Sequence, residues 1–186
     1  MRWFIVLLVL GVLLFPVLLF TSTTPVTTSV TTPVEAATPP DGSVIFWDGG
    51  FLVNPIERRT GSRLTHSAVV LNGMVYEAVP PCVHRVPFAD YMEELKVKSQ
   101  KRSDFSFFIL SPKKPYTNEQ VLKMVLYGDS QLGRLYMLRG YGKRVTRGVF
   151  CSQLVANVLE RGGQIRSADF WESPGSLHKK LKPIYQ

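Results

Sequence analysis

An Asn72-Gly73 pair between two apolar, β-branched runs is the feature that most restricts how this chain can fold. The first run is Thr65–Leu71 and the second is Met74–Val79. A two-residue turn of type I′ needs a positive φ at both central positions, which Asn and Gly tolerate, so the pair predicts a β-hairpin. The turn also sets the register of the hairpin, because the two residues that flank it must face each other.

In this register His66 and Glu77 lie on one face of the hairpin as diagonal neighbours. Diagonal Cβ atoms are roughly 7 Å apart or somewhat less, a gap that an imidazole and a carboxylate can close. A carboxylate on the core-facing side of a strand needs a partner, and His66 is the nearest one. Arg63 and Arg85 are the alternative partners for Glu77.

Cys151 is predicted to lie in the first turn of an amphipathic helix. The helix is indicated by apolar residues at helical spacing and by a pair of glycines at its end, namely Leu154, Val155, Val158 and Leu159, then Gly162 and Gly163. The partial positive charge of a helix N-terminus favours the thiolate, which is the nucleophile. If the fold brings His66 to this helix end, the chain has a base, an orienting carboxylate and a nucleophile in His66, Glu77 and Cys151.

Three segments, Thr65–Val70, Val75–Ala78 and Phe150–Val155, occur in this order. Together they resemble the motifs of the YiiX-like, circularly permuted papain-fold cysteine hydrolases, which are related to NlpC-type peptidases and to lecithin:retinol acyltransferase. Asp41–Phe46 is similar to the opening strand of that family, and Ser173–Leu177 to its closing segment. The resemblance covers roughly Asp41 to the C-terminus.

The resemblance implies a permuted papain-like fold and a thiol hydrolase or acyltransferase that acts on an amide or ester bond of a peptide or an acyl lipid. It assigns the triad to Cys151, His66 and Glu77 and implies no cofactor. The family usually has Tyr before the cysteine and Glu two residues after it, where this chain has Phe150 and Gln153. A missing carboxylate in the first turn removes a charge that would oppose the thiolate, so Gln153 is compatible with activity.

The position after the histidine also departs from the family, which often has Val-Gly where this chain has Ser67-Ala68. The added side chain lies where the backbone of the family approaches substrate, so substrate choice could differ. Each candidate also has a structural interpretation, since a helical cysteine is commonly a small buried hydrophobe and a strand histidine is commonly structural.

The second cysteine, Cys82, could pair with Cys151 in an oxidising compartment, but a disulfide would remove the proposed nucleophile. We therefore expect Cys82 to be a free or buried thiol. With His84 two residues later it could form half of a metal site. No CxxC motif or further Cys/His cluster accompanies the pair, so we expect no metal.

The N-terminal residues 1–20 contain an uninterrupted apolar segment, Trp3–Phe20, preceded by Arg2. As a helix this segment spans about 27 Å, close to a hydrocarbon core. A cleaved signal usually has a shorter apolar region with an Ala-x-Ala-like site soon after it, whereas Val34–Ala36 lies well downstream. We therefore favour a single-pass signal anchor over a signal peptide. Arg2 precedes the segment and the next basic residue is Arg58, which predicts an extracytoplasmic or luminal domain, or a secreted one if the segment is cleaved.

Residues 21–40 are almost entirely Thr, Ser, Pro, Val and Ala, a composition typical of an extended tether. Residues 41–186 are predicted to form one α+β domain, with an antiparallel sheet packed against helices and Cys151 at the sheet edge near His66. Besides the hairpin, we expect strands at Ser43–Trp47, Val83–Pro87 and Phe105–Leu110, and helices at Asp90–Val97, from a Thr117 capping box to about Tyr127, and at Cys151.

The chain carries a formal net charge of +8, with basic clusters at Lys96–Arg102, Arg139–Arg147 and His178–Lys182. The clusters indicate either a solvated surface or attraction to anionic lipid headgroups or an acidic cell-wall polymer. No nucleic-acid recognition motif is present, and we expect no nucleic-acid partner. The alternative to a peptidase or a lipid enzyme is a non-catalytic, basic, membrane-tethered binding module on the same scaffold.

Overall fold

A computed structural model describes residues 37–49, 57–58, 60–137, 148–166 and 172–186. The predicted anchor or signal in residues 1–20 and residues 21–36 of the tether lie outside the described residues. The helices and strands are β1 (Val44–Asp48), β2 (Leu64–Leu71), β3 (Met74–Ala78), β4 (Val83–Pro87), α2 (Phe88–Lys101), β5 (Ser106–Leu110), α3 (Asn118–Gln131), β6 (Leu135–Tyr136), β7 (Gly148–Val149), α4 (Cys151–Arg161) and α5 (Pro174–Leu181).

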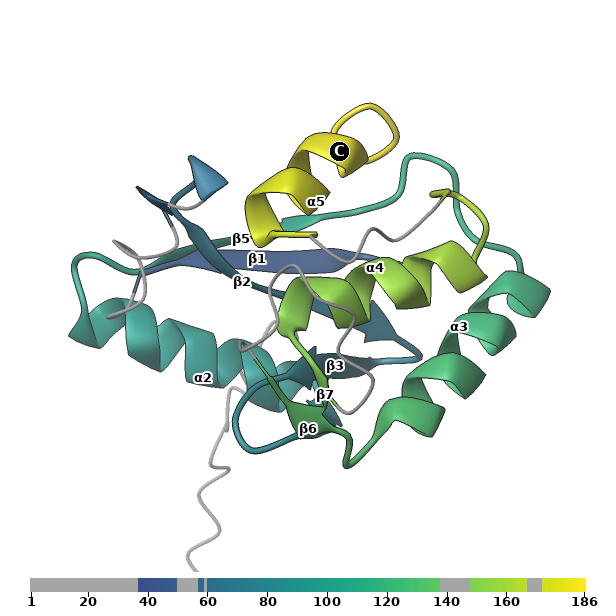
Figure 1. The fold of residues 1–186 in the computed structure, drawn as a ribbon, viewed down its shortest axis with the longest axis horizontal. Coiled ribbons are helices and arrows are strands. Elements are labelled where there is room, and N and C mark those ends of the chain that lie inside the picture. Colours follow the sequence, from purple (N-terminus) through teal and green to yellow (C-terminus); the bar gives the residue numbers. More distant parts are fainter. Residues whose placement is uncertain (1–36, 50–56, 59, 138–147, 167–171) are drawn as a thin grey trace, which may run out of the picture. The chain divides into compact units, whose positions relative to one another are not determined.

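Five strands form an antiparallel sheet in the order β4-β3-β2-β1-β5 (Figure 1). The predicted hairpin is β2–β3, and Leu71 faces Met74 as the turn required. Asn72 and Gly73 have φ values of 50° and 71°, so both adopt the left-handed conformation that a type I′ turn needs. The register predicted from the Asn-Gly pair is therefore confirmed.

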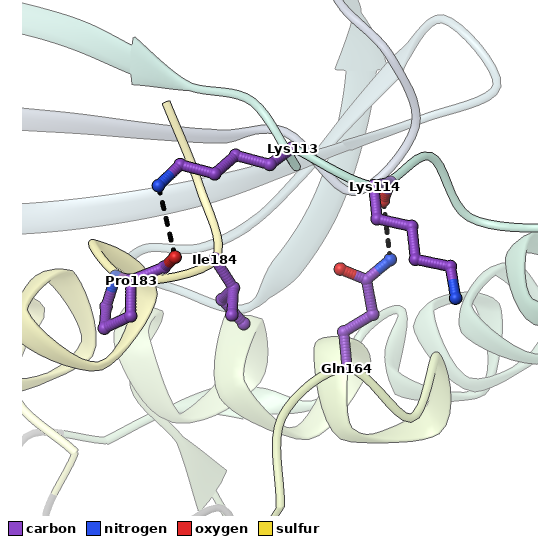
Figure 2. A pocket seen from close by; sticks show the side chains of 5 residues that line it. All are labelled: Lys113, Lys114, Gln164, Pro183 and Ile184. Atoms are coloured by element: carbon purple, nitrogen blue, oxygen red, sulfur yellow. Dashed lines mark hydrogen bonds between the residues drawn. The ribbon is translucent and has the colours of Figure 1, made fainter.

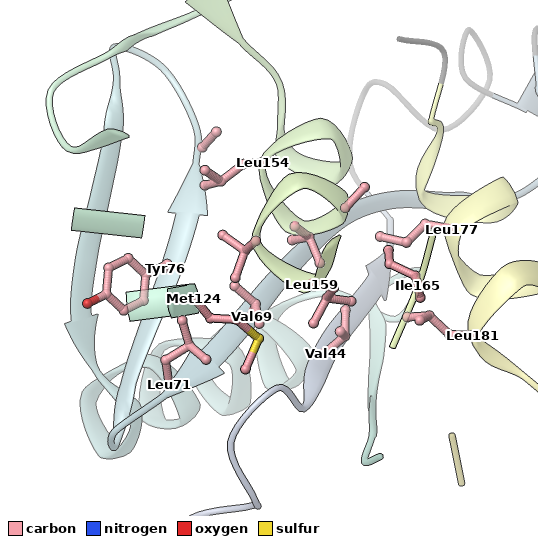
Figure 3. Close-up of a cluster of buried hydrophobic side chains, with 14 of the residues drawn as sticks. Val44, Val69, Leu71, Tyr76, Met124, Leu154, Leu159, Ile165, Leu177 and Leu181 are labelled. Carbon is pink, nitrogen blue, oxygen red and sulfur yellow. The ribbon is translucent and has the colours of Figure 1, made fainter. Parts of the chain in front are cut away.

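The sheet is covered on both faces, because alternate residues of its strands point to opposite sides. One face packs against α2 through Ile45, Ala68, Val70, Val75, Phe88, Tyr91 and Leu95. The other packs against α3, α4 and α5 in a larger cluster that includes Val44, Val69, Tyr76, Met124, Leu154, Leu159, Leu177 and Leu181 (Figure 3). The predicted α+β class, an antiparallel sheet packed against helices, is confirmed.

Two helices are longer than their sequence patterns predicted. The Thr117 capping box is present, but α3 continues past Tyr127 to Gln131. It does so through Gly128, where a Cβ would lie 3.0 Å from two ring atoms of Tyr76, so the glycine lets α3 approach the sheet closely. On the other face, α2 extends from Phe88 to Lys101, because Phe88 adds a buried contact at its start.

Helix α5 has a capping box that the sequence analysis did not recognise. The Ser173 hydroxyl accepts from the backbone N–H of Ser176, and the Ser176 hydroxyl accepts from the backbone N–H of Ser173. Serine takes the place of the usual Glu or Gln in this motif, which hides it from a pattern search. Within the described ranges, no helix has the length and apolar character needed to cross a membrane.

Candidate active site

His66 and Glu77, the two candidate residues of the predicted hairpin, contact each other where β2 and β3 separate. The β2–β3 ladder ends at the pair Val69 and Tyr76, and His66 and Glu77 lie beyond it on the α2 face of the sheet. His66 Nε2 is 2.9 Å from Glu77 Oε2, and each side chain is only 7% exposed. The contact expected from the hairpin register is present.

The carboxylate of Glu77 has further partners that sequence reasoning did not identify. The Tyr91 hydroxyl on α2 donates to Oε2 at 2.9 Å, and His84 Nε2 on β4 lies 3.0 Å from Oε1. Burial by itself raises the pKa of Glu77, but the hydrogen bond and positive charge of His66, the Tyr91 hydroxyl and His84 together lower it below its usual value. Glu77 is therefore an ionised, buried carboxylate.

The alternative partners considered for Glu77 interact elsewhere. Arg63 Nε lies 3.9 Å from an Asp48 carboxylate oxygen. Arg85 donates to the Tyr76 hydroxyl at 3.1 Å and pairs with Asp129. The partners of Glu77 are therefore the histidines His66 and His84, and the two arginines pair with other carboxylates.

Cys151 begins α4 and is 4% exposed. Its thiol adjoins the His66 imidazole and the backbone groups of Ser67 and Ser152, which all favour the thiolate. Because His66 uses Nε2 for Glu77, Nδ1 is the ring nitrogen left for Cys151. The structure thus brings together all three candidate residues, Cys151, His66 and Glu77.

The approach of the Ser67 backbone to the thiol follows from the topology of the sheet. Val70 N–H donates to Ser43 on the β1 side, so strand alternation directs the N–H of Ser67 to the β3 side. There the ladder has already ended at Val69, which leaves the Ser67 N–H available to the sulfur of Cys151.

The pKa values of His66 and Cys151 move in opposite directions. Burial lowers the pKa of His66, but the thiolate charge of Cys151, the hydrogen bond to it and the contact with Glu77 raise it to about 9. Burial raises the pKa of Cys151, but the His66 charge and hydrogen bond and the backbone hydrogen bonds lower it below its usual value. Both shifts favour a thiolate beside an imidazolium over a neutral thiol beside a neutral imidazole.

Two further aromatic residues adjoin this pair. Trp47 on β1 is the register partner of His66 and stacks on its ring at a centroid distance of 3.9 Å. Tyr136 pairs with Val149 in the short parallel ladder β6–β7, close to where α4 begins. Burial and the Cys151 charge raise the pKa of Tyr136, so its phenol stays protonated near the thiolate.

Two of the positions that depart from the family carry buried polar atoms. Within the described part of the chain, Ser67 Oγ and Gln153 Oε1 have no hydrogen-bond partner. Gln153 lies in the first turn of α4 and Ser67 beside the thiol. Ser67 follows His66 directly, and Gln153 lies two residues after Cys151.

Both cysteines are free thiols. Cys82 is partly buried and forms an isolated bridge with Leu135. The expectation that Cys82 stays unpaired is confirmed.

Figure 2 shows a pocket of about 320 Å³ in volume. It is lined by Lys113, Lys114, Gln164, Pro183 and Ile184. Gln164 follows the C-terminal end of α4, whereas Cys151 begins this helix, so the pocket and the thiol are at opposite ends. The polar groups at the pocket already bond to the chain, since Gln164 donates to the Lys114 carbonyl at 2.8 Å and Lys113 to the Pro183 carbonyl at 3.2 Å.

The arrangement of these elements places the chain among α+β proteins in which a helix begins against the edge of an antiparallel sheet. Among solved structures it is similar to the crystal structure of the metalloprotein YiiX from Escherichia coli O157:H7, a DUF1105 protein, with a TM-score of 0.54 and 20% sequence identity. The match covers 69% of this chain and 68% of YiiX, and it shows a YiiX-like fold. No family model matches the chain, and no curated protein matches it.

YiiX is described as a metalloprotein. In the ranges of this chain that the structure describes, no group of three or more His, Cys, Asp or Glu side chains is arranged to hold a metal ion. His66 and His84 both lie against the carboxylate of Glu77.

Proposed function

We propose that this chain is a cysteine hydrolase or acyltransferase of the permuted papain-like type, acting on an amide or ester bond of a peptide or an acyl lipid. The observation that carries the proposal is the series Cys151, His66 and Glu77, in which His66 bonds to Glu77 and adjoins the thiol in the first turn of α4. A buried thiol with a lowered pKa beside an oriented imidazole is the arrangement that nucleophilic catalysis by cysteine requires.

In the first half of the reaction the Cys151 thiolate attacks the carbonyl carbon of the substrate. A carbon–sulfur bond forms, and the carbonyl electron pair moves to oxygen to give a tetrahedral oxyanion. The backbone N–H of Cys151, in the first turn of α4, is a candidate donor to this oxyanion. As the oxyanion collapses, His66 gives its proton to the departing amine or alcohol, and a thioester on Cys151 remains.

In the second half His66 acts as the base. Its neutral ring takes a proton from water, for hydrolysis, or from an acceptor alcohol or amine, for transfer. The acceptor oxygen or nitrogen attacks the thioester carbon, the thiolate leaves, and the ion pair of Cys151 and His66 is restored. Glu77 holds the imidazole throughout and stabilises its charged form.

Attachment to a membrane is part of the proposal and rests on the sequence. Residues 1–20 would act as a single-pass anchor, or as a cleaved signal, and residues 21–40 would tether an extracytoplasmic or luminal domain. Two described basic clusters, Lys96–Arg102 and His178–Lys182, are candidates for contact with an anionic surface.

The test is covalent labelling of the full-length chain with iodoacetamide at mildly acidic pH. We expect Cys151 to react faster than Cys82, because its thiolate forms at lower pH. Cys151→Ala should lose the fast reaction, whereas the matched control Cys82→Ala should keep it. Equal rates for the two thiols in the folded wild-type chain would favour the non-catalytic binding module.

The substrate class is tested by mass spectrometry of the chain mixed with peptide, acyl-ester and acyl-amide panels. A mass increase on Cys151 equal to the acyl group, absent in Cys151→Ala, identifies the thioester and the substrate that formed it. The released product then distinguishes hydrolysis from transfer, according to whether water or an added alcohol or amine receives the acyl group. A fast-labelling thiol that forms no thioester with any panel would count against these two substrate classes.

A further inference from the structure

The carboxylate of Glu77 contacts two histidines, one at each oxygen. Oε2 is 2.9 Å from His66 Nε2 and also accepts from the Tyr91 hydroxyl. Oε1 is 3.0 Å from His84 Nε2. Among the residues that the structure describes, His84 is the one side chain that engages Oε1.

His84 reaches Glu77 because the two residues face each other across the β3–β4 ladder. Directly opposed residues of an antiparallel pair have Cβ atoms about 5 Å apart, which suits a contact between an imidazole and a carboxylate. The side chain of His84 is 40% exposed, whereas that of Glu77 is 7% exposed. His84 is therefore the solvent-facing end of a series that runs from Cys151 through His66 and Glu77.

The two oxygens of Glu77 need different partners to define its orientation. His66 and Tyr91 both bind Oε2, and neither restricts where Oε1 points. A buried carboxylate oxygen without a donor is costly, so an unpaired Oε1 would turn toward another donor or toward water. The contact with His84 removes this freedom and keeps Oε2 directed at His66.

The His84 ring lies close enough to Glu77 to form an ion pair with it. Its Nδ1 lies 3.4 Å from the Cys82 carbonyl oxygen and its Nε2 faces Glu77 Oε1, so acceptors lie on both sides of the ring. The contact with Oε1 is an ion pair when the imidazole is charged, and the His84 charge is among the causes that lower the pKa of Glu77.

We propose that His84 is a positioning residue that holds Glu77 through its second oxygen and thereby keeps His66 oriented toward Cys151. This inference rests on the proposed function, since it assigns His84 a part in the same site. In the described ranges the contacts of the His84 ring are with Glu77 and the Cys82 carbonyl, so it acts on the reaction through Glu77.

A pH profile can detect this role, because it reports the ion pair directly. The titratable groups around Glu77 and the thiol are His66 on β2, Tyr91 and Glu94 on α2, Tyr136 on β6, Cys151 on α4 and His84 itself. Without His84, Glu77 is held less firmly and stabilises the charged form of His66 less. Because less of His66 is charged, the Cys151 thiolate is stabilised less in turn. Loss of His84 should therefore move formation of the Cys151 thiolate to higher pH.

The experiment measures iodoacetamide alkylation of Cys151 in the full-length chain between about pH 5 and pH 10, a range that spans ordinary histidine and cysteine titrations. We expect His84→Ala to slow alkylation of Cys151 at mildly acidic pH by at least about threefold, since the hydrogen bond between Glu77 and the charged His66 is weakened. We also expect the pH midpoint of thiolate formation at Cys151 to rise. His84→Gln keeps a donor for Oε1 and should stay within about twofold of wild type.

The matched control is Arg85→Ala. Arg85 is on the same strand and similarly exposed, at 42%, but it pairs with Asp129 instead of Glu77. Its removal should leave the thiolate titration unchanged. If His84→Ala lowers only the melting temperature and leaves the thiolate titration of Cys151 in place, then His84 is structural and the proposal is wrong.

A double-mutant cycle tests whether His84 acts through Glu77. In a Glu77→Gln chain the added His84→Ala change should alter alkylation by less than about twofold, because residues that act through one contact are not additive. Additive effects would overturn the proposal, as would His84→Gln behaving like His84→Ala. A wild-type Cys151 that reacts no faster than Cys82 would instead refute the proposed function, so the two failures are distinguishable.

Discussion

Trp47 and His66 are register partners on β1 and β2, and their rings stack with centroids 3.9 Å apart and an interplanar angle of 17°. The indole covers one face of the imidazole, while Glu77 and Cys151 bind its edge. The ring is therefore held by its face and by its edge. Because an aromatic face attracts a cation, the stack also favours the imidazolium.

The first prediction concerns this stack. Trp47→Ala should slow alkylation of Cys151 at mildly acidic pH by about 2- to 10-fold, the range that corresponds to an aromatic contact of about 0.5–1.5 kcal/mol. Trp47→Phe keeps an aromatic face and should retain most of the rate. Alkylation rates and circular dichroism are measured on the same samples. An unchanged rate in a folded Trp47→Ala chain would show that edge contacts alone orient His66.

The second prediction separates the roles of the base and the carboxylate. His66→Ala should lower turnover by about 10²- to 10⁴-fold, the usual contribution of a general acid–base residue. Glu77→Gln should keep the fold and lower turnover by about 10- to 100-fold, since an amide bonds an imidazolium more weakly than a carboxylate does. Turnover is measured on the substrate that forms the Cys151 thioester.

The control for the Glu77→Gln variant is Glu93→Gln, which makes the same change at an exposed position of α2. It should leave turnover at the wild-type level. Full activity of Glu77→Gln would mean that Glu77 is structural and that another group orients His66.

The contact between His66 and Glu77 was predictable because a single turn fixes the register of the β2–β3 hairpin. Asn72 and Gly73 allow a single hairpin geometry, and counting back along both strands then gives the diagonal pair. No comparable signal precedes β4, where the segment between Glu77 and His84 carries two prolines in place of a standard two-residue turn. The pairing of His84 with Glu77 therefore had to come from the structure.

Long-range contacts were harder to predict than local ones. The position of Cys151 in the first turn of α4 followed from helical spacing, whereas its contact with His66 was expected from the packing of helices on the sheet and from the resemblance to a family. Tyr136 had no signal at all, since a two-residue parallel ladder brings it beside Val149. A ladder this short has no periodicity that a sequence search could detect.

The third prediction concerns the N-terminal segment. If residues 1–20 form an uncleaved anchor, the full-length chain should resist alkaline carbonate extraction, and protease should reach the domain only from the extracytoplasmic side. The first cuts should fall within residues 21–40, because that composition has no core to protect it. A soluble form that begins within residues 21–37 would instead identify a cleaved signal. Digestion of the domain from the cytoplasmic side would contradict the orientation.

The fourth prediction follows from the raised pKa of His66, about 9, and the lowered pKa of Cys151. The charged His66 stabilises the fold fully below its ordinary pKa of 6.5, and this contribution is lost as pH rises through about 9. The contribution of the Cys151 thiolate has the opposite sign, being present above the ordinary thiol pKa of 9.0 and lost as pH falls through the lowered value. The ion pair therefore exists between the two values.

Turnover should accordingly fall on the alkaline side near pH 9, because the leaving group needs the His66 proton, whereas alkylation should not fall there, because the thiolate persists. Of the groups that raise the pKa of His66, Cys151 contributes most, so Cys151→Ala should move the His66 titration well below 9. Nuclear magnetic resonance titration of the three histidines, assigned with His66→Ala, measures this shift. A His66 titration that stays near 9 without the thiol would assign the raised pKa to Glu77 and remove the main support for a thiolate–imidazolium pair.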